Sequence, residues 1–242
     1  MQPAPHERMK AASEKIVQAT DAFGDKKTRG KKNAEIVLPE NLWDKYSEKN
    51  TTSHQLLVKA IFKQIEIKDM NTASHSRAVA YYSECIGICL GITDKKLSLL
   101  KDAALLHDTG KIMVDLVILN KKGSLDGRER LQMQRHAEMG MRALCGFHLS
   151  DAITDAAWHH HERWDGAGYP DGLKGEEINL FTRIVSISDA LEAMSAARPY
   201  NRPLPFDQII QEISAGAGKQ FDPKLAKKVK HLLEKGKIQI MG

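Results

Sequence analysis

The sequence contains little cysteine, and its few cysteines follow no metal-binding pattern. Cys85, Cys89 and Cys145 are the three cysteines among 242 residues. An odd number without CxxC spacing argues against a disulfide framework and against a zinc site built on thiolates. The cysteines therefore indicate neither a secreted disulfide scaffold nor a zinc finger.

The chain also lacks a long apolar run. The longest one, residues 78–92, is interrupted by Ser83 and Glu84 and is too short to cross a bilayer. Residues 1–10 contain no apolar segment of the kind found in secretory signals. We therefore predict a cytoplasmic protein without a membrane span.

Most of the net positive charge lies at one end of the chain. The net charge is +5, and residues 1–33 hold eight Lys and Arg against four Asp and Glu, which leaves +1 for the rest. A basic tail is more often a solvated extension than a contact to nucleic acid. We predict a basic, flexible extension and linker over 1–33, a folded domain over 34–242, and no nucleic-acid partner.

Neither an internal repeat nor βαβ alternation is visible, and helical periodicity dominates after the linker. Strand-like runs are short and confined to 36–38 and 117–119. Thr72 is a candidate helix cap, and Pro223 directly after Asp222 fits the first turn of a helix. The pattern predicts an all-α helical bundle, with helices over about 42–67, 72–91, 95–107, 126–145, 149–161, 180–196, 205–216 and 222–235.

Histidines and carboxylates carry the candidate chemistry. Ten histidines are present, although a single helical histidine is more often an ordinary core or surface residue than a ligand. Asp108 and Asp189 each follow an apolar run, and a buried carboxylate is costly unless it is paired or bound to a metal. His160 and His161 precede a glycine-rich turn at 166–170, which could grip a substrate. Imidazoles and carboxylates together suit iron, manganese or zinc.

Several segments form an ordered series between about residues 56 and 233. They are His75-Ser76-Arg77, 106–112, 118–125, 135–140, 160–178, 183–189, Arg198-Pro199-Tyr200 and Phe221-Asp222-Pro223. This series resembles the HD-GYP family, a branch of the HD superfamily of metal-dependent phosphohydrolases. Its order and lack of large gaps make it far more specific than a His-Asp dipeptide alone. The resemblance implies a helical bundle of the HD-domain type.

The resemblance also implies an activity and a cofactor. The activity is hydrolysis of the bacterial second messenger cyclic di-GMP to pGpG or GMP, with two divalent ions, iron or manganese in preference to zinc. A hydroxide that bridges the two ions would attack the phosphodiester in line. One ion would be held by His75, His107, Asp108 and Asp189, and Asp108 would bridge to a second ion held by His136, His160 and His161.

Further residues match the family's substrate contacts. Lys111 is similar to the lysine of the family's DxxK motif and would stabilise or protonate the leaving oxygen. Arg198 matches a phosphate-contacting arginine, and Tyr169 would project toward guanine or phosphate. Arg183 and Arg202 are additional candidate contacts. Two alternatives stay open: another cyclic dinucleotide such as cyclic GMP-AMP, and a non-catalytic module that senses cyclic di-GMP or docks a diguanylate cyclase.

The sequence departs from the family pattern at a few positions. Asn71 stands where some members carry a glutamate that helps to hold a third metal, which favours two ions. Asn201 replaces a basic residue, so that one phosphate contact is lost unless Arg202 supplies it, and Glu192 replaces a common aspartate. No receiver domain is visible in 1–55, so regulation would come from a receiver-type partner unless the chain is a fragment. The helix at 42–67 would serve either a homodimer or an intramolecular brace.

Overall fold

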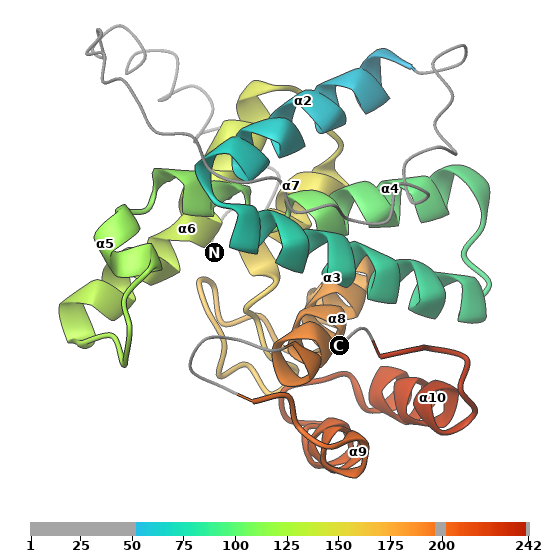
Figure 1. Ribbon diagram of the computed structural model, residues 1–242. Coiled ribbons are helices and arrows are strands. Elements are labelled where there is room, and N and C mark those ends of the chain that lie inside the picture. Colours follow the sequence, from blue (N-terminus) through green and yellow to red (C-terminus); the bar gives the residue numbers. More distant parts are fainter. Residues whose placement is uncertain (1–51, 197–201, 241–242) are drawn as a thin grey trace, which may run out of the picture. The chain divides into compact units, whose positions relative to one another are not determined.

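The computed structural model describes residues 52–196 and 202–240 (Figure 1). The chain divides into two units between Leu57 and Val58, and the second unit holds all of the predicted metal ligands. Several expectations lie outside the described residues: the extension over 1–33, the strand-like run 36–38, the beginning of the helix at 42–67, Arg198 and Asn201.

Helices make up most of the described part of the chain, as the periodicity predicted. No strand occurs among the described residues, where Ala217 and Phe221 form an isolated bridge. The all-α prediction is confirmed. The helices are α2 (Ser53–Lys68), α3 (Met70–Cys89), α4 (Asp94–Leu106), α5 (Leu116–Leu119), α6 (Gly127–Gly146), α7 (Asp151–His159), α8 (Leu180–Ser195), α9 (Phe206–Ala215) and α10 (Pro223–Glu234), with 3-10 turns η4 (Thr109–Met113) and η5 (Gly175–Glu177).

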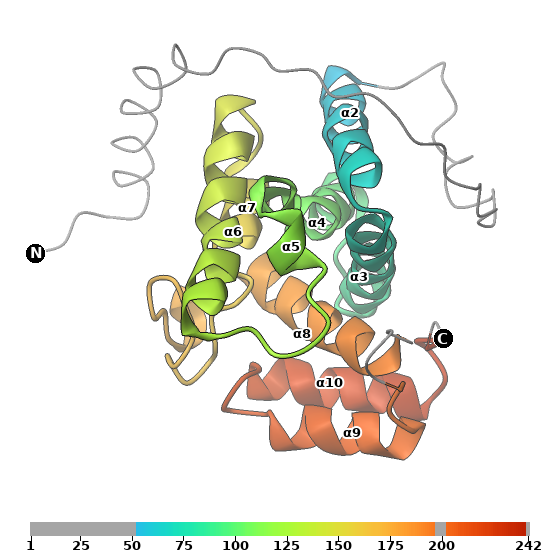
Figure 2. The same cartoon turned by 60° about the vertical axis from the view of Figure 1, so that its left-hand side comes forward.

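The core lies between α3, α4, α6, α7 and α8. α4 packs against α3 and α7, α6 packs against α7, and α8 packs against α3. Figure 2 shows α9 and α10 side by side beneath α8. Each large apolar side chain that is removed from water contributes about 1.5–3 kcal/mol to folding. Fully buried examples are Tyr82, Ile86, Leu100, Leu106, Leu144, Ile153, Ile184 and Leu191.

Aspartates begin several of these helices, and one cap differs from the prediction. Asp69 caps α3, because its carboxylate accepts hydrogen bonds from the backbone N–H groups of Asn71 and Thr72. Thr72 lies inside the helix and donates its hydroxyl to Asp69 at 2.6 Å, so its prediction as the cap was wrong. Asp222 caps α10 with Pro223 in the first turn, as expected.

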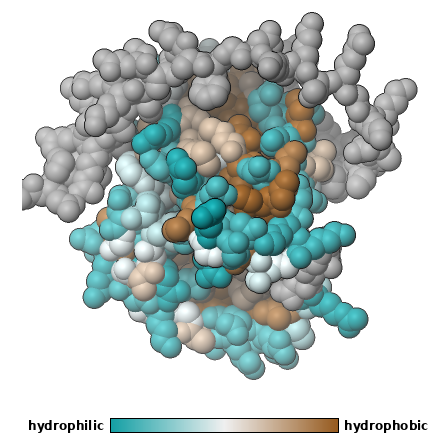
Figure 3. Space-filling view, turned by 90° about the vertical axis from the view of Figure 1, so that its left-hand side faces the viewer, coloured by the Kyte–Doolittle hydropathy of each residue, from teal (hydrophilic) through white to brown (hydrophobic). Residues whose placement is uncertain are grey.

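The strand-like run 117–119 is helical, in agreement with the all-α prediction. These residues belong to α5, a short helix that Asp115 caps by accepting from the N–H of Val117. β-branched residues favour strands, but the local cap and the following turn override that preference. α5, η4 and α6 leave apolar side chains exposed, and apolar residues are visible among polar ones on the side of the molecule where α5 and α6 lie (Figure 3). None of the described helices is long and apolar enough to cross a membrane.

Candidate metal centre

The seven ligands predicted from the sequence converge on one region of the bundle. Their ligand atoms fall into overlapping groups whose members all lie within 4.8 Å of one another. The side chains come from helix interiors and helix ends: His75 from α3, His107 and Asp108 from the end of α4, His136 from α6, His160 and His161 from the end of α7, and Asp189 from α8.

The end of α4 allows two adjacent residues to face the same point. Asp108 has φ −98° and ψ 13°, so the chain leaves the α-helical path directly after His107. The Thr109 hydroxyl donates to the carbonyl of Leu106 at 2.7 Å and secures the turn. In a continuing helix, neighbouring side chains point about 100° apart. The change of path therefore brings His107 and Asp108 to one centre.

Gly110 fixes the separation between η4 and α6. A Cβ atom at this position would lie 1.8 Å from the backbone oxygen of His136 and 2.5 Å from the backbone nitrogen of Gly140. No side chain fits there without displacement of one of the two backbones. Glycine at 110 therefore allows Asp108 to approach His136.

The carboxylate of Asp108 lies between two groups of histidines. Its Oδ2 atom is 3.4 Å from His75 Nε2 and 3.3 Å from His107 Nε2. Its Oδ1 atom is 3.4 Å from His136 Nε2 and 3.7 Å from His160 Nε2. The side chain is 1% exposed, and Oδ1 has no hydrogen-bond partner among the described residues. A buried carboxylate in this position is suited to join two cation sites.

In three histidines, a backbone carbonyl determines which ring nitrogen carries the proton. Nδ1 of His107 is 2.7 Å from the carbonyl of Ala104, Nδ1 of His136 is 2.6 Å from that of Met133, and Nδ1 of His160 is 3.0 Å from that of Ala156. A carbonyl oxygen accepts only, so each Nδ1 carries the proton. In the neutral rings Nε2 then presents a lone pair to the centre, which is the form that binds a metal.

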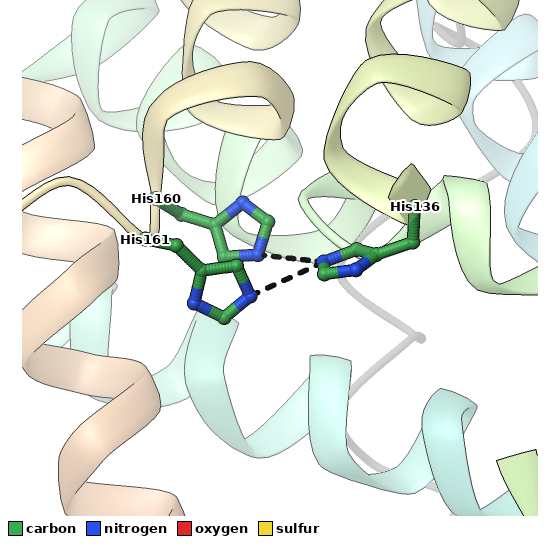
Figure 4. A group of neighbouring side chains, drawn as sticks. All are labelled: His136, His160 and His161. Atoms are coloured by element: carbon green, nitrogen blue, oxygen red, sulfur yellow. Dashed lines mark hydrogen bonds between the residues drawn. The ribbon is translucent and has the colours of Figure 1, made fainter. Parts of the chain in front are cut away.

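The histidines of the second group point their Nε2 atoms at one another. Nε2 of His136 lies 3.2 Å from Nε2 of both His160 and His161 (Figure 4). Lone pairs that face each other at this distance repel unless a proton or a cation lies between them. A divalent ion satisfies all three nitrogens at once, so these residues fit a metal.

The electrostatics of this trio favour metal binding. Burial, followed by the charges of neighbouring histidines, lowers the pKa of His160 well below its usual value. Burial and then His136 lower the pKa of His161 to about 4. Burial is also the main cause that lowers the pKa of His136. The three rings are therefore neutral at pH 7, as metal ligands must be.

His75, His107 and Asp189 form the other group. His75 Nε2 lies 3.3 Å from His107 Nε2 and 3.2 Å from Asp189 Oδ1. Burial alone would raise the pKa of Asp189, but its hydrogen bond with His75 and the nearby imidazoles lower it, so the carboxylate is charged. Burial opposes the charge on His75, but hydrogen bonds with Asp108, Asp189 and Glu192 raise its pKa well above the usual value.

Lys111 and Tyr169 border the centre. Lys111 Nζ lies 2.5 Å from Asp108 Oδ2. The Tyr169 ring stacks on His161, with ring centroids 4.8 Å apart and planes 25° from parallel. Gly168 lies against the start of the same loop, since a Cβ atom there would be 2.5 Å from the backbone nitrogen of Arg163. The loop thus folds back on itself and places Tyr169 over His161, one of the predicted ligands.

The predicted arginine contacts lie in different settings. Arg183 Nη1 donates to Asp222 at 2.6 Å, and its guanidinium lies 5.5 Å from the centre of a Trp164 ring. Arg202 is exposed, and Arg198 lies outside the described residues. The structure therefore places Arg183 in an ion pair that ties α8 to the cap of α10.

Two side-chain pairings next to the centre were not predicted from the sequence. Glu192 Oε2 lies 2.6 Å from His75 Nδ1, although these residues are 117 positions apart. His159 lies between Asp155 and Asp171, with one ring nitrogen near each carboxylate. The i, i+4 spacing of Asp155 and His159 was a local signal for their contact, whereas no local signal existed for the contact of His75 with Glu192.

Comparison with known proteins places this site in a family. A family model described as an HD domain matches residues 59–225. The chain belongs to the HD domain family. The HD-GYP resemblance of the ordered motifs is confirmed by the relatives that this HD domain matches.

Three of these relatives illustrate the extent of the similarity. The HD domain is 36% identical over 171 residues to 3'3'-cGAMP-specific phosphodiesterase 2 of Vibrio cholerae, which covers 70% of this chain and 33% of that protein. It is 35% identical over 164 residues to the cyclic di-GMP phosphodiesterase response regulator RpfG of Xanthomonas campestris, with coverage of 67% and 43%. An HDG"Y"P protein structure from Bdellovibrio bacteriovorus shares the fold, with TM-score 0.57, 20% identity, and coverage of 78% and 66%. The chain thus spans less than half the length of these curated relatives.

Proposed function

We propose that this HD domain is a metal-dependent phosphodiesterase that hydrolyses cyclic di-GMP to pGpG, GMP or both. The position of Asp108 carries the proposal, because its two carboxylate oxygens face two separate groups of histidines. The similarity to proteins named as cyclic di-GMP phosphodiesterases, at 35% and 36% identity, supports this substrate.

We infer two divalent ions, iron or manganese, although imidazole and carboxylate ligands also accept zinc. When bound, such a pair supplies a nucleophile from water at neutral pH and stabilises charge on the phosphodiester oxygens. Asn71 is exposed at the start of α3 and adds no carboxylate for a third ion. His75, His107, Asp108 and Asp189 would hold one ion, and Asp108, His136, His160 and His161 would hold the other; the ligand atoms of these residues lie in neighbouring groups.

The chain's own residues orient the substrate and move a proton. The Asp108 side chain is 1% exposed, whereas those of Lys111 and Asp189 are both 24% exposed, so the substrate reaches the centre from the side of these two. There Lys111 holds a proton at Nζ for the leaving oxygen. Tyr169, fixed against His161, offers an aromatic face and a hydroxyl to a guanine base or a phosphate.

A second candidate substrate is 3'3'-cGAMP, since a relative at 36% identity is named for that activity. The two substrates share the phosphodiester ring and differ in one base, so both fit the same ligand set. A diguanylate cyclase or receiver-type partner, and a homodimer, remain proposals for the assembly.

The test is to incubate the metal-loaded protein with cyclic di-GMP and with 3'3'-cGAMP separately and to resolve the products by chromatography. We expect pGpG or GMP from cyclic di-GMP with iron or manganese bound. If the protein binds cyclic di-GMP but does not hydrolyse it, the enzyme proposal is wrong and a non-catalytic sensor is favoured. Much faster cleavage of 3'3'-cGAMP would assign the second substrate.

A further inference from the structure

His159 is a buried histidine next to two ligands that takes no part in the ligand set. It is 4% exposed and ends α7. Its Nδ1 lies 2.7 Å from Asp155 Oδ1, and its Nε2 lies 3.1 Å from Asp171 Oδ2. Both ring nitrogens are therefore engaged by carboxylates, and neither is available to an ion at the centre.

Asp155 anchors this histidine to the core of the bundle. Its second oxygen, Oδ2, accepts the hydroxyl hydrogen of Thr182 at 2.6 Å. Thr182 is fully buried on α8, so the carboxylate links α7 to α8. The Trp158 ring is stacked on the His159 ring, with centroids 5.2 Å apart and planes 6° from parallel. These contacts hold the imidazole in the orientation that directs its Nε2 atom toward Asp171.

Asp171 is held from two directions at the end of the loop that carries Tyr169. The backbone N–H groups of Asp171 and Gly172 donate to Glu162 Oε1 at 2.7 and 3.0 Å. The Asp171 side chain meets His159 from α7. Glu162 thus closes the loop on itself, whereas His159 attaches the closed loop to the bundle.

Tyr169 lies two residues before this attachment point and stacks on the ligand His161. The Tyr169 N–H also donates to the His161 carbonyl at 3.4 Å. A loop released at Asp171 keeps this bond and its internal Glu162 bonds but loses the side-chain bond that joins it to α7. We propose that His159 is a positioning residue that, through Asp171, sets the Tyr169 loop for substrate binding. The substrate part of this statement rests on the proposed function.

Two isosteric variants separate the two bonds of His159. The amide nitrogen of glutamine can occupy the place of Nε2 and donate to Asp171, so His159→Gln keeps the bond to the loop. The side-chain amide of asparagine matches Nδ1, so His159→Asn keeps the hydrogen bond to Asp155 and loses the hydrogen bond to Asp171 in the loop. Asp171→Ala removes the same loop bond from an exposed position that does not endanger folding, and Glu176→Ala is the control at another exposed acidic residue nearby.

We expect His159→Asn and Asp171→Ala to raise KM for cyclic di-GMP about 10- to 100-fold, the effect of one lost hydrogen bond to a charged group. The value of kcat and the metal content should stay close to those of the unmodified protein. His159→Gln and Glu176→Ala should leave KM within about 2-fold, since neither removes the loop bond. Loss of kcat and metal in step with KM in every His159 variant, or an unchanged KM in Asp171→Ala, would overturn the positioning role.

Hydrogen exchange of the metal-loaded protein, followed by mass spectrometry, tests the same attachment without turnover. Peptides that contain Asp171 and Gly172 should exchange faster in His159→Asn and Asp171→Ala, but not in His159→Gln. This result would stand even if the protein cleaved no cyclic dinucleotide, which distinguishes failure of the attachment from failure of the proposed function. Equal exchange in all variants would contradict the attachment.

Discussion

Glu192 and His75 form a carboxylate–imidazole pair, in which Glu192 Oε2 accepts from His75 Nδ1 at 2.6 Å. The Glu192 side chain is 9% exposed, so water competes little for this bond. His107, His136 and His160 instead direct Nδ1 to backbone carbonyls, which mutation cannot remove. Among these histidines, His75 is therefore the predicted ligand whose orientation can be tested by a side-chain change.

Glu192→Ala should weaken metal binding about 10- to 100-fold, because it removes the acceptor that orients His75. Glu192→Gln is the matched variant, since its amide oxygen still accepts from Nδ1. Metal retained after dialysis against a graded series of chelator concentrations measures the difference. Equal retention in both variants would show that Glu192 does not orient the ligand.

Lys111→Met should lower kcat for cyclic di-GMP about 100- to 10,000-fold, the usual contribution of a general acid. Metal content should be preserved, because Lys111 is not in the ligand set. The control is Lys96→Met at an exposed position on α4. If elemental analysis shows that Lys111→Met loses an ion, Lys111 is needed for metal binding, and its role in proton transfer is contradicted.

Gly110→Ala should reduce stability by about 1–3 kcal/mol or more, since the added Cβ would lie 1.8 Å from the backbone oxygen of His136. Chemical denaturation measures this loss. Gly127→Ala, where a Cβ meets nothing within 4 Å, is the control and should be neutral or stabilising by up to about 1 kcal/mol. Equal stability of the two variants would refute the close approach of η4 and α6.

Arg183→Met should lower the free energy of unfolding by about 3 kcal/mol, because it leaves the buried Asp222 carboxylate without its partner. KM for cyclic di-GMP should change little if the ion pair is the main role of Arg183. The sequence predicted a substrate contact instead, and that prediction requires a raised KM with unchanged stability. Denaturation and steady-state kinetics on one variant decide between the two.

The bundle and the grouping of the seven predicted ligands were accessible from the sequence because both depend on patterns that lie along the chain. Apolar periodicity gave helices close to those observed, and the ordered motifs marked Asp108 and its neighbours. Thr72 was mistaken for a cap because Asp69, three residues earlier, is the stronger competitor. Local patterns alone cannot resolve that competition.

Pairings between distant residues were not accessible. His75 meets Glu192 across 117 positions, and Arg183 meets Asp222 across 39. Such contacts depend on how helices are oriented in the bundle, which periodicity does not determine. The protonation pattern of the ligands was hidden for a related reason, since it follows from which carbonyl each Nδ1 reaches.

The most direct test of the account is the number of metal ions per chain, measured by elemental analysis of the purified protein and of its Asp108→Ala and Lys96→Met variants. The account predicts two ions in the unmodified protein and in Lys96→Met, and almost none in Asp108→Ala, because the Asp108 carboxylate faces both groups of histidines. Two ions retained in Asp108→Ala, or none bound by the unmodified protein after exposure to iron or manganese, would contradict it.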